Sequence, residues 1–367
     1  MNSTGYRCRA VHAGVAPQEM APTTWTETHM TQTLNRRHFL RNTGRLGLGL
    51  LTASLAAPYV AKANATQLRI VSNPGLENAT LNLLMEKQDY LRQFGANALI
   101  VEAAGTSGPF DAITAGVADI CMISGSNMVL PRIAEGAPVK IVGAGMRRCA
   151  LTLFARSGDI STLTDLEGKS VAVGPPKGLL HMLTVQLLRE AGIDASQVHF
   201  IDKGGNDECH AAVVKGEVDA CCSSVSHLND NDGLVTIRGA DMWEALPRCI
   251  FQTAYASESA LLNQHANIVA VMAAYGSLYE YLMSPAAHDA FFEARKQVQK
   301  KFDNSSAQAV WNFYQTQQPY ARDLSLTNEE INYLQDMEIN LGNLTQRQPE
   351  RAIADMTAAH DAATLIR

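Results

Sequence analysis

The sequence predicts an α/β protein with two lobes, each a mostly parallel sheet flanked by helices, joined by two hinge crossovers and followed by a helical tail. Short apolar strands alternate with amphipathic helices from residue 68 to residue 257, a pattern typical of parallel sheets with helices on both faces. A helix-to-strand phrase also occurs twice, as Gly116-Val117-Ala118-Asp119-Ile120 and as Gly216-Glu217-Val218-Asp219-Ala220. Two copies about a hundred residues apart indicate two similar lobes rather than a repeat array.

The first 65 residues are expected to be absent from the mature protein. Residues 1–29 lack apolar periodicity and are interpreted as an upstream mis-start or a disordered extension, with Met30 as the better start. Arg36 and Arg37, followed by an apolar segment at 46–60, predict a twin-arginine signal peptide over 30–65. The alternative is a transmembrane anchor, but it needs about 20 apolar residues, and the segment at 46–60 is shorter than that. The predicted cleavage falls after Ala65, which places the mature chain in the periplasm.

The charge of the predicted mature chain argues against some partners. Residues 66–367 hold 23 Lys and Arg against 34 Asp and Glu, so their net charge is −11. Nucleic acids and anionic membranes require a basic surface. We therefore expect neither nucleic-acid nor membrane-surface binding.

Four strands are predicted in the first lobe, over residues 68–72, 96–104, 118–123 and 139–144. Asn73-Pro74-Gly75 is a turn that precedes a helix over 76–94, and the glycine-rich turn at 105–108 precedes a helix that begins at Pro109. Each helix start directs unpaired N–H groups into the turn before it, which suits an anion or a polar ligand.

The second lobe is predicted to repeat this plan after a strand over 146–156. Strands at 170–174 and 198–202 are followed by helices after Pro175-Pro176-Lys177-Gly178 and over 207–215. Residues 249–257 are the predicted return strand, and helices are expected over 257–283, 285–302 and 307–316.

Two segments carry a family resemblance. The stretch that ends in DAITAGVADICMISGSN, and the DLEGKSVAVG that begins at Asp165, resemble the nitrate, sulfonate and taurine (thiamine-pyrimidine-precursor-like) family of ABC-transporter substrate-binding proteins. The resemblance implies the type II periplasmic-binding fold, a monomer, delivery of a small solute to a membrane permease, and no cofactor. The expected lobes are 66–150 plus 256–367, and 151–255.

Polar residues at strand ends and helix starts form the predicted ligand site. Donors outnumber acceptors among them, so a small organic anion, a carboxylate or a sulfonate, is the expected ligand. The candidates from the two lobes are Asn73, Gly105, Thr106, Ser107, Gly108, Ser124, Ser126, Asn127, Lys177, Gly178, Asn206, Ser223 and Ser224.

No catalytic residue or metal site is predicted. His181, Lys177 and His227 lack a neighbouring nucleophile motif and are interpreted as surface or ligand contacts. Cys221 and Cys222 have no partners at metal-ligand spacing and are expected to be buried small hydrophobes. The CCCFC iron motif of a fungal thiamine-pyrimidine synthase on this fold is missing.

Six cysteines follow residue 65. Antiparallel pairing of the two crossover strands, with Leu153 opposite Thr253, would separate Cys149 from Cys249 beyond disulfide reach. These two are therefore predicted not to be bonded, and Cys209 with Cys222 are nearer candidates.

Two alternatives to solute delivery remain open: an exported enzyme on the same fold and a ligand sensor for a membrane kinase. Turnover of a bound ligand would favour the enzyme, and neighbouring genes would separate sensing from transport.

Overall fold

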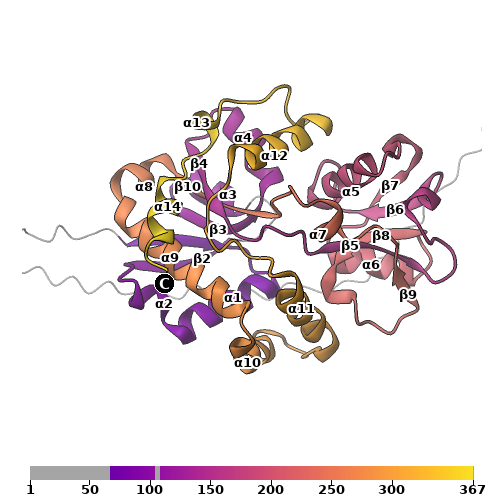
Figure 1. Ribbon diagram of the computed structural model, residues 1–367, viewed down its shortest axis with the longest axis horizontal. Helices are drawn as coiled ribbons and strands as arrows, with labels where there is room; N and C mark the ends of the chain where they lie inside the picture. The colour runs from indigo at the N-terminus through magenta and orange to yellow at the C-terminus, as the bar shows by residue number, and fades with distance from the viewer. Residues whose placement is uncertain (1–66, 104–107, 367) are drawn as a thin grey trace, which may run out of the picture. The chain divides into compact units, whose positions relative to one another are not determined.

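The computed structural model describes residues 67–103 and 108–366 (Figure 1). The predicted signal peptide and the candidate ligand residues Gly105, Thr106 and Ser107 lie outside these residues. Among the described residues, no helix is both long and apolar enough to cross a membrane.

Two five-stranded sheets of the same topology organise the described chain. The strand orders are β2-β1-β3-β10-β4 and β7-β6-β8-β5-β9, and in each sheet the fourth strand is antiparallel to both of its neighbours. The strands are β1 Leu68–Ser72, β2 Ala98–Glu102, β3 Ile120–Gly125, β4 Val139–Ala144, β5 Leu151–Arg156, β6 Ser170–Val173, β7 His199–Asp202, β8 Ala220–Ser224, β9 Leu234–Thr236 and β10 Gln252–Ser257.

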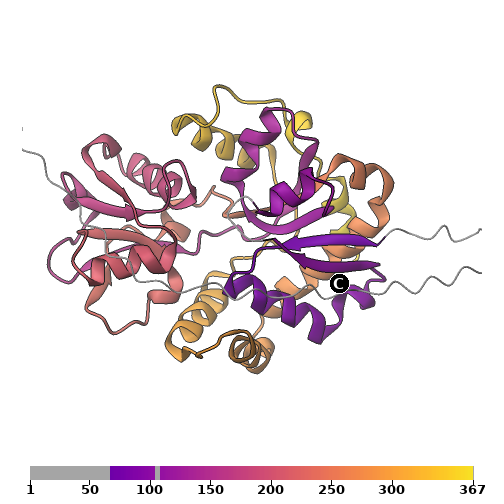
Figure 2. The same cartoon turned by 180° about the vertical axis from the view of Figure 1, so that it is seen from behind.

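Helices flank both sheets, and most of those in the C-terminal part of the chain pack around the first (Figures 1 and 2). The helices are α1 Leu76–Gln88, α2 Tyr90–Gln93, α3 Gly108–Thr114, α4 Leu130–Ala134, α5 Leu179–Glu190, α6 Asn206–Val214, α7 Met242–Ala245, α8 Glu258–Asn263, α9 His265–Leu282, α10 His288–Val298, α11 Asn304–Gln317, α12 Asn328–Asn340, α13 Glu350–Ile353 and α14 Thr357–Ala363. The helix expected over 76–94 is broken at Asp89, whose φ of 56° is left-handed and ends α1.

The repeated phrase ends a helix and anchors a strand in both lobes. Gly116 and Gly216 adopt φ of 70° and 74°, which terminates α3 and α6 in Schellman motifs. Three residues later, Asp119 accepts hydrogen bonds from the backbone N–H and the guanidinium of Arg69, each at 2.8 Å. Asp219 correspondingly accepts from the backbone N–H of Ser170 at 2.8 Å and from its hydroxyl at 2.6 Å. Each carboxylate thus fixes the start of the adjacent parallel strand.

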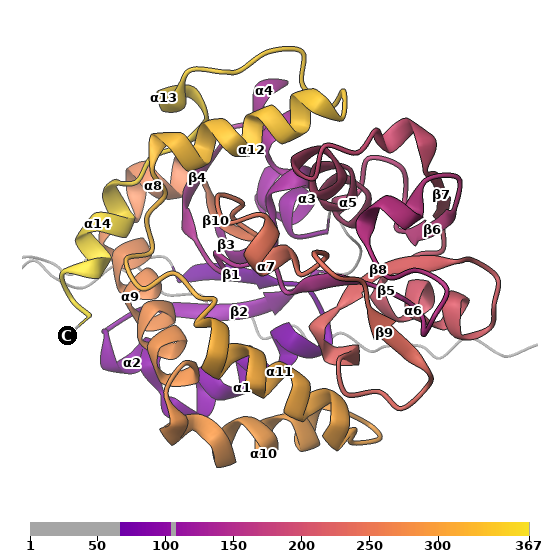
Figure 3. The ribbon, with the colours of Figure 1, turned by 45° about the vertical axis from the view of Figure 1, so that its right-hand side comes forward.

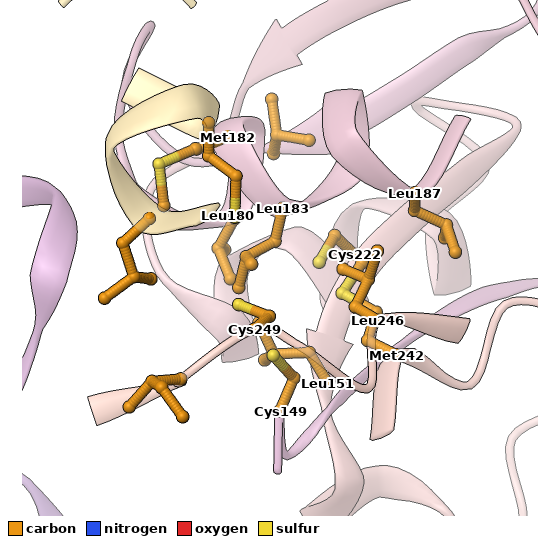
Figure 4. Packing of buried hydrophobic residues seen from close by; sticks show 14 of the residues in the cluster. Cys149, Leu151, Leu180, Met182, Leu183, Leu187, Cys222, Met242, Leu246 and Cys249 are labelled. Carbon is orange, nitrogen blue, oxygen red and sulfur yellow. The ribbon is translucent and has the colours of Figure 1, made fainter. Parts of the chain in front are cut away.

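Cys149 and Cys249 were predicted to lie beyond disulfide reach of each other, and that distance is wrong. The prediction assumed that β5 pairs with β10, but these strands lie in different sheets. The two thiols instead contact each other, and both side chains are buried (Figure 4). Contact with Cys249 and burial raise the pKa of the Cys149 thiol well above its ordinary value. Both are free thiols, as are Cys209 and Cys222.

The crossovers fall beside, not within, the strands proposed as hinges. The sequence favours hinge closure absorbed by residues 149–154 and 251–255. Most of these residues lie in β5 and β10, and β10 has a register shift between Thr253 and Tyr255. The connecting residues are 145–150 and 246–251. Since β10 pairs within the first sheet, we propose a division in which β10 belongs to the first lobe.

Helix α12 connects the first sheet's helices to the second lobe (Figure 3). Tyr333 of α12 accepts a hydrogen bond from Gln186 of α5 at 3.1 Å and donates one to Glu190 at 3.1 Å. Just after α12, the carbonyl of Gly342 accepts a hydrogen bond from the Lys177 ammonium at 2.8 Å.

Candidate functional site

A cavity of about 170 Å³ lies where the crossovers leave the two sheets. We call it the crossover cavity. Helix starts, strand ends, both crossovers and α11 line it, through Gly75, Glu77, Asn78, Leu81, Ile123, Met146, Ala150, Leu151, Asn206, Ser224, Val225, Phe251, Gln252, Val310, Tyr314 and Tyr320. More than half of these residues are apolar, so the cavity combines hydrophobic walls with a few polar groups, as small-molecule sites do.

Two helices begin at the cavity, one from each lobe. Gly75 precedes α1, which no side chain of the described residues caps, and Gly205 precedes α6, where the Glu208 carboxylate accepts a hydrogen bond from the Gly205 N–H at 3.0 Å. The first turns contribute Glu77, Asn78 and Asn206 to the lining. The remaining N–H groups and the positive ends of two helix dipoles favour a negatively charged or strongly polar group here.

Two side-chain amides in the cavity have oxygen atoms without a partner among the described residues. The Oδ1 atom of Asn206 and the Oε1 atom of Gln252 are buried and have no hydrogen bond within the described chain. Leaving such a group unpaired costs about 1–3 kcal/mol, so a bound polar ligand would relieve the cost. Because an amide presents both a donor and an acceptor, Asn206 and Gln252 can bind the same ligand from the two lobes.

Two tyrosines supply hydroxyl groups. The Tyr320 hydroxyl donates to the Tyr314 hydroxyl at 3.0 Å, and the Tyr320 ring stacks on Tyr279 with centroids 4.6 Å apart. Burial raises the pKa of Tyr314 to about 12 and that of Tyr320 well above its ordinary value. Both rings are therefore neutral near pH 7 and available for hydrogen bonding.

Among the described residues, one carboxylate lines the crossover cavity, and it is partly neutralised. Glu77 lies 3.1 Å from the guanidinium of Arg295, whose exposed fraction is 1%. Arg295 also donates to the Ser306 hydroxyl at 3.3 Å, which ties α10 to the start of α11.

A second cavity of about 350 Å³ adjoins the first and shares Gly75, Glu77, Asn206 and Ser224 with it. We call it the acidic cavity, because the carboxylates of Glu77, Asp207, Glu208, Asp230 and Asp303 line it. His227 is the single basic side chain in this lining.

The structure brings together only part of the predicted ligand set. Asn206 and Ser224 line the crossover cavity, and the buried Ser223 hydroxyl donates to the Asn206 carbonyl at 2.8 Å, which positions α6. Sequence reasoning missed Gln252, Tyr314 and Tyr320. Gln252 is a large polar residue in the mostly apolar segment 249–256, which was a usable signal.

Other candidates from the first lobe lie outside the lining of this cavity. Ser124, Ser126 and Asn127 are buried at the carboxyl end of β3. A Cβ at Gly125 would come within 3.2 Å of Leu179, so the start of α5 packs against this edge. Asn73 has a buried Oδ1 atom without a partner but is not a lining residue, and Gly108 begins α3.

Lys177 and Gly178 also lie outside the lining of the crossover cavity. The Lys177 ammonium donates to the Gly342 carbonyl, and its backbone N–H donates to the His181 ring at 2.9 Å. Gly178 closes a turn by donating to the Pro175 carbonyl at 2.8 Å. The exposed Lys177 therefore links the second lobe to the end of α12.

A family model described as NMT1/THI5 like matches residues 78–287. The chain belongs to this family. No curated protein matches the chain. Helices and strands from both lobes fall within the matched residues, and the crossover cavity is lined mostly by them.

Solved structures share the fold at low sequence identity. The periplasmic aliphatic sulphonate binding protein SsuA from Escherichia coli is 17% identical, with a TM-score of 0.65 over 79% of this chain and 92% of that one. The alkanesulfonate-binding protein SsuA from Xanthomonas axonopodis pv. citri, bound to MOPS, is 18% identical, with a TM-score of 0.61 over 82% and 98%. A Candida albicans protein described as having the generic periplasmic binding protein fold is 14% identical, with a TM-score of 0.60 over 79% and 96%. The fold is thus that of the periplasmic binding proteins, as the sequence predicted.

Proposed function

We propose that this protein is the solute-binding component of an ABC importer and holds a small organic anion, a sulfonate or a carboxylate, in the crossover cavity. The observation that carries the proposal is the pair of side-chain amides of Asn206 and Gln252, which reach the same cavity from different lobes and whose buried oxygens have no partner within the described residues. A ligand bound by both would hold the lobes together, and this closed form is what a permease would recognise.

The ligand class rests on the polar end of the cavity. Two helix starts, two amides and the neutral Tyr314 hydroxyl offer several donors to the oxygens of an anionic group. The apolar wall formed by residues such as Leu81, Met146 and Phe251 suits a short hydrocarbon portion. Two proteins of similar fold are named as binding sulfonates.

Export and partners follow from this role. We propose that the twin-arginine segment over 30–65 directs the folded chain to the periplasm and is removed after Ala65. We further propose that the mature protein acts as a monomer with a membrane permease. It releases its ligand unchanged, since binding and release require no bond to break.

A calorimetric panel tests the ligand class. Short alkanesulfonates and carboxylates should bind with one ligand per chain, while neutral sulfones and amides of matched size should bind more weakly. Asn206→Ala and Gln252→Ala should each reduce anion affinity roughly 10- to 100-fold, as expected for the loss of one charge-assisted hydrogen bond.

Lys177→Ala is the matched control for that panel. It removes a positive charge from the second lobe, but this charge interacts with Gly342 and lies outside the lining of the cavity. We expect no selective loss of anion affinity. If neutral and cationic solutes bind while every anion fails, the proposed ligand class is wrong.

A further inference from the structure

Two histidines and an aspartate meet beside the acidic cavity. His210 lies on α6, and His227 and Asp230 follow β8. Their ligand atoms, one from each residue, all lie within 4.8 Å of one another. The two imidazole rings stack with centroids 3.9 Å apart and planes inclined by 10°.

His210 presents an unused nitrogen to this cluster. Its exposed fraction is 4%, and its buried Nε2 atom has no hydrogen-bond partner within the described chain. The nearest carboxylate oxygen, from Asp232, is 3.5 Å away. The edge of the Phe154 ring packs against the imidazole with centroids 5.2 Å apart, which fixes the ring orientation. A buried, oriented and unpartnered imidazole nitrogen is a suitable metal ligand.

His227 is held between two carboxylates. Its Nδ1 atom lies 2.7 Å from Asp230, and its Nε2 atom lies 3.2 Å from Asp207. When Nδ1 binds an ion together with Asp230, Nε2 keeps its proton and donates to Asp207. Such a carboxylate behind a ligating histidine orients the ring and raises its basicity.

The charges of the cluster also favour a cation. Asp207, Asp230 and Asp232 bring three carboxylates to two imidazoles.

We propose that His210, His227 and Asp230 bind a divalent transition-metal ion of the zinc class, with its remaining coordination position open toward the acidic cavity. Zinc takes nitrogen ligands at about 2.0–2.1 Å, so tetrahedral ligand atoms lie roughly 3.3 Å apart. The widest separation in the cluster, up to 4.8 Å, must therefore close, while the 2.7 Å contact of His227 with Asp230 must open. Two imidazoles select zinc, cobalt or nickel over magnesium and calcium, which prefer oxygen ligands only. The 17-residue separation of the histidines matches no familiar zinc spacing, which is why the sequence predicted no metal site.

The site is distinct from solute binding. Its ligands belong to the second lobe alone, and none of them lines the crossover cavity. Titration of zinc in the absence of any solute therefore tests this proposal whether or not the proposed function is correct.

The test uses the full mature chain, without an affinity tag and treated with a chelator. Calorimetry with Zn²⁺ should give one ion per chain, Mg²⁺ should give no heat of binding, and Co²⁺ should develop visible absorption bands of a histidine–carboxylate site. Because a ligating imidazole must be unprotonated, zinc affinity should be lower at pH 5.5 than at pH 7.5.

Variants locate the ion. Asp207→Asn alters only the carboxylate behind His227 and should weaken zinc binding roughly 10- to 100-fold, while Asp230→Asn and His227→Gln should weaken it more. His288→Gln is the matched control, since His288 forms a single exposed pair with Asp289 at 2.8 Å. Circular dichroism confirms that each variant is folded.

Zinc affinity that Asp230→Asn and His227→Gln leave unchanged would overturn the proposal, and so would the absence of zinc binding by the parent chain at micromolar concentration. If His288→Gln reduced zinc affinity as much as these variants do, the ion would bind at the surface, and the proposal would also be wrong.

Discussion

The two lobes use one sequence phrase with two different partners. Asp119 is 7% exposed and forms an ion pair with Arg69, whereas Asp219 is exposed and bonds to the hydroxyl and backbone of Ser170. In both lobes the backbone N–H of the aspartate also donates to the residue that its carboxylate binds. The repeated five-residue sequence thus fixes how the end of a helix joins the start of a strand. Burial decides how much this arrangement adds to the free energy of unfolding.

The largest expected effect comes from the first lobe. Asp119→Ala leaves the guanidinium and the backbone N–H of Arg69 without their carboxylate, and we expect a loss of about 3 kcal/mol of unfolding free energy. Urea denaturation measures it. Asp336→Ala is the control, because it breaks an exposed pair with Arg347 and should cost at most about 1 kcal/mol. Equal losses in both variants would show that burial does not separate these pairs.

A smaller effect is expected at the equivalent position of the second lobe. Asp219→Asn weakens the hydrogen bonds to Ser170 at an exposed site, so about 1 kcal/mol should be lost at pH 7.

The pH dependence of this loss identifies its cause. Hydrogen bonds from the Ser170 side chain and backbone lower the pKa of Asp219 below its ordinary value of 3.8. A lowered pKa in the folded state means that the stabilisation is present above pH 3.8 and disappears as the pH falls through the folded-state value. The difference between the parent and Asp219→Asn should therefore shrink in acid, and a constant difference down to pH 2 would contradict this account.

The smallest difference is expected between the two glycines of the phrase. Alanine at Gly116 or Gly216 must adopt a left-handed conformation, at a cost of about 1 kcal/mol each. A Cβ at Gly216 would also lie 3.2 Å from the Arg156 guanidinium, while none of the described atoms that surround Gly116 lies that close. Thermal denaturation should rank Gly216→Ala slightly below Gly116→Ala, and the reverse order would argue against steric contact with Arg156.

Local patterns predicted most of the fold. The strands β1 and β4 begin and end where apolar runs meet turn residues, and both were predicted with their observed bounds. The break at Asp89 was missed because the left-handed residue there is not a glycine. The pairing of β5 with β10 was wrong, since a strand's partner depends on contacts far away in the sequence.

The candidate site was less predictable for a similar reason. Asn206 and Ser224, which line the crossover cavity, were predicted because they follow the local pattern of a helix start and a strand end. Tyr314 comes from a tail helix that carries no ligand motif, and it reaches the cavity only through the packing of α11. His210 and His227 come together because α6 packs beside the end of β8, a relation that no sequence spacing expresses.

Labelling of the buried cysteines can report local unfolding of the described chain. All six described thiols are buried, and burial raises the pKa of Cys121 and Cys209 to about 11 and that of Cys222 to about 12. A thiol reacts as its thiolate, so labelling at neutral pH requires the surrounding structure to open first. Cys149 and Cys249 lie on the two crossovers, while Cys221 and Cys222 lie inside the second sheet. The order in which these thiols are labelled would therefore time local opening at the crossovers separately from the unfolding of the second lobe.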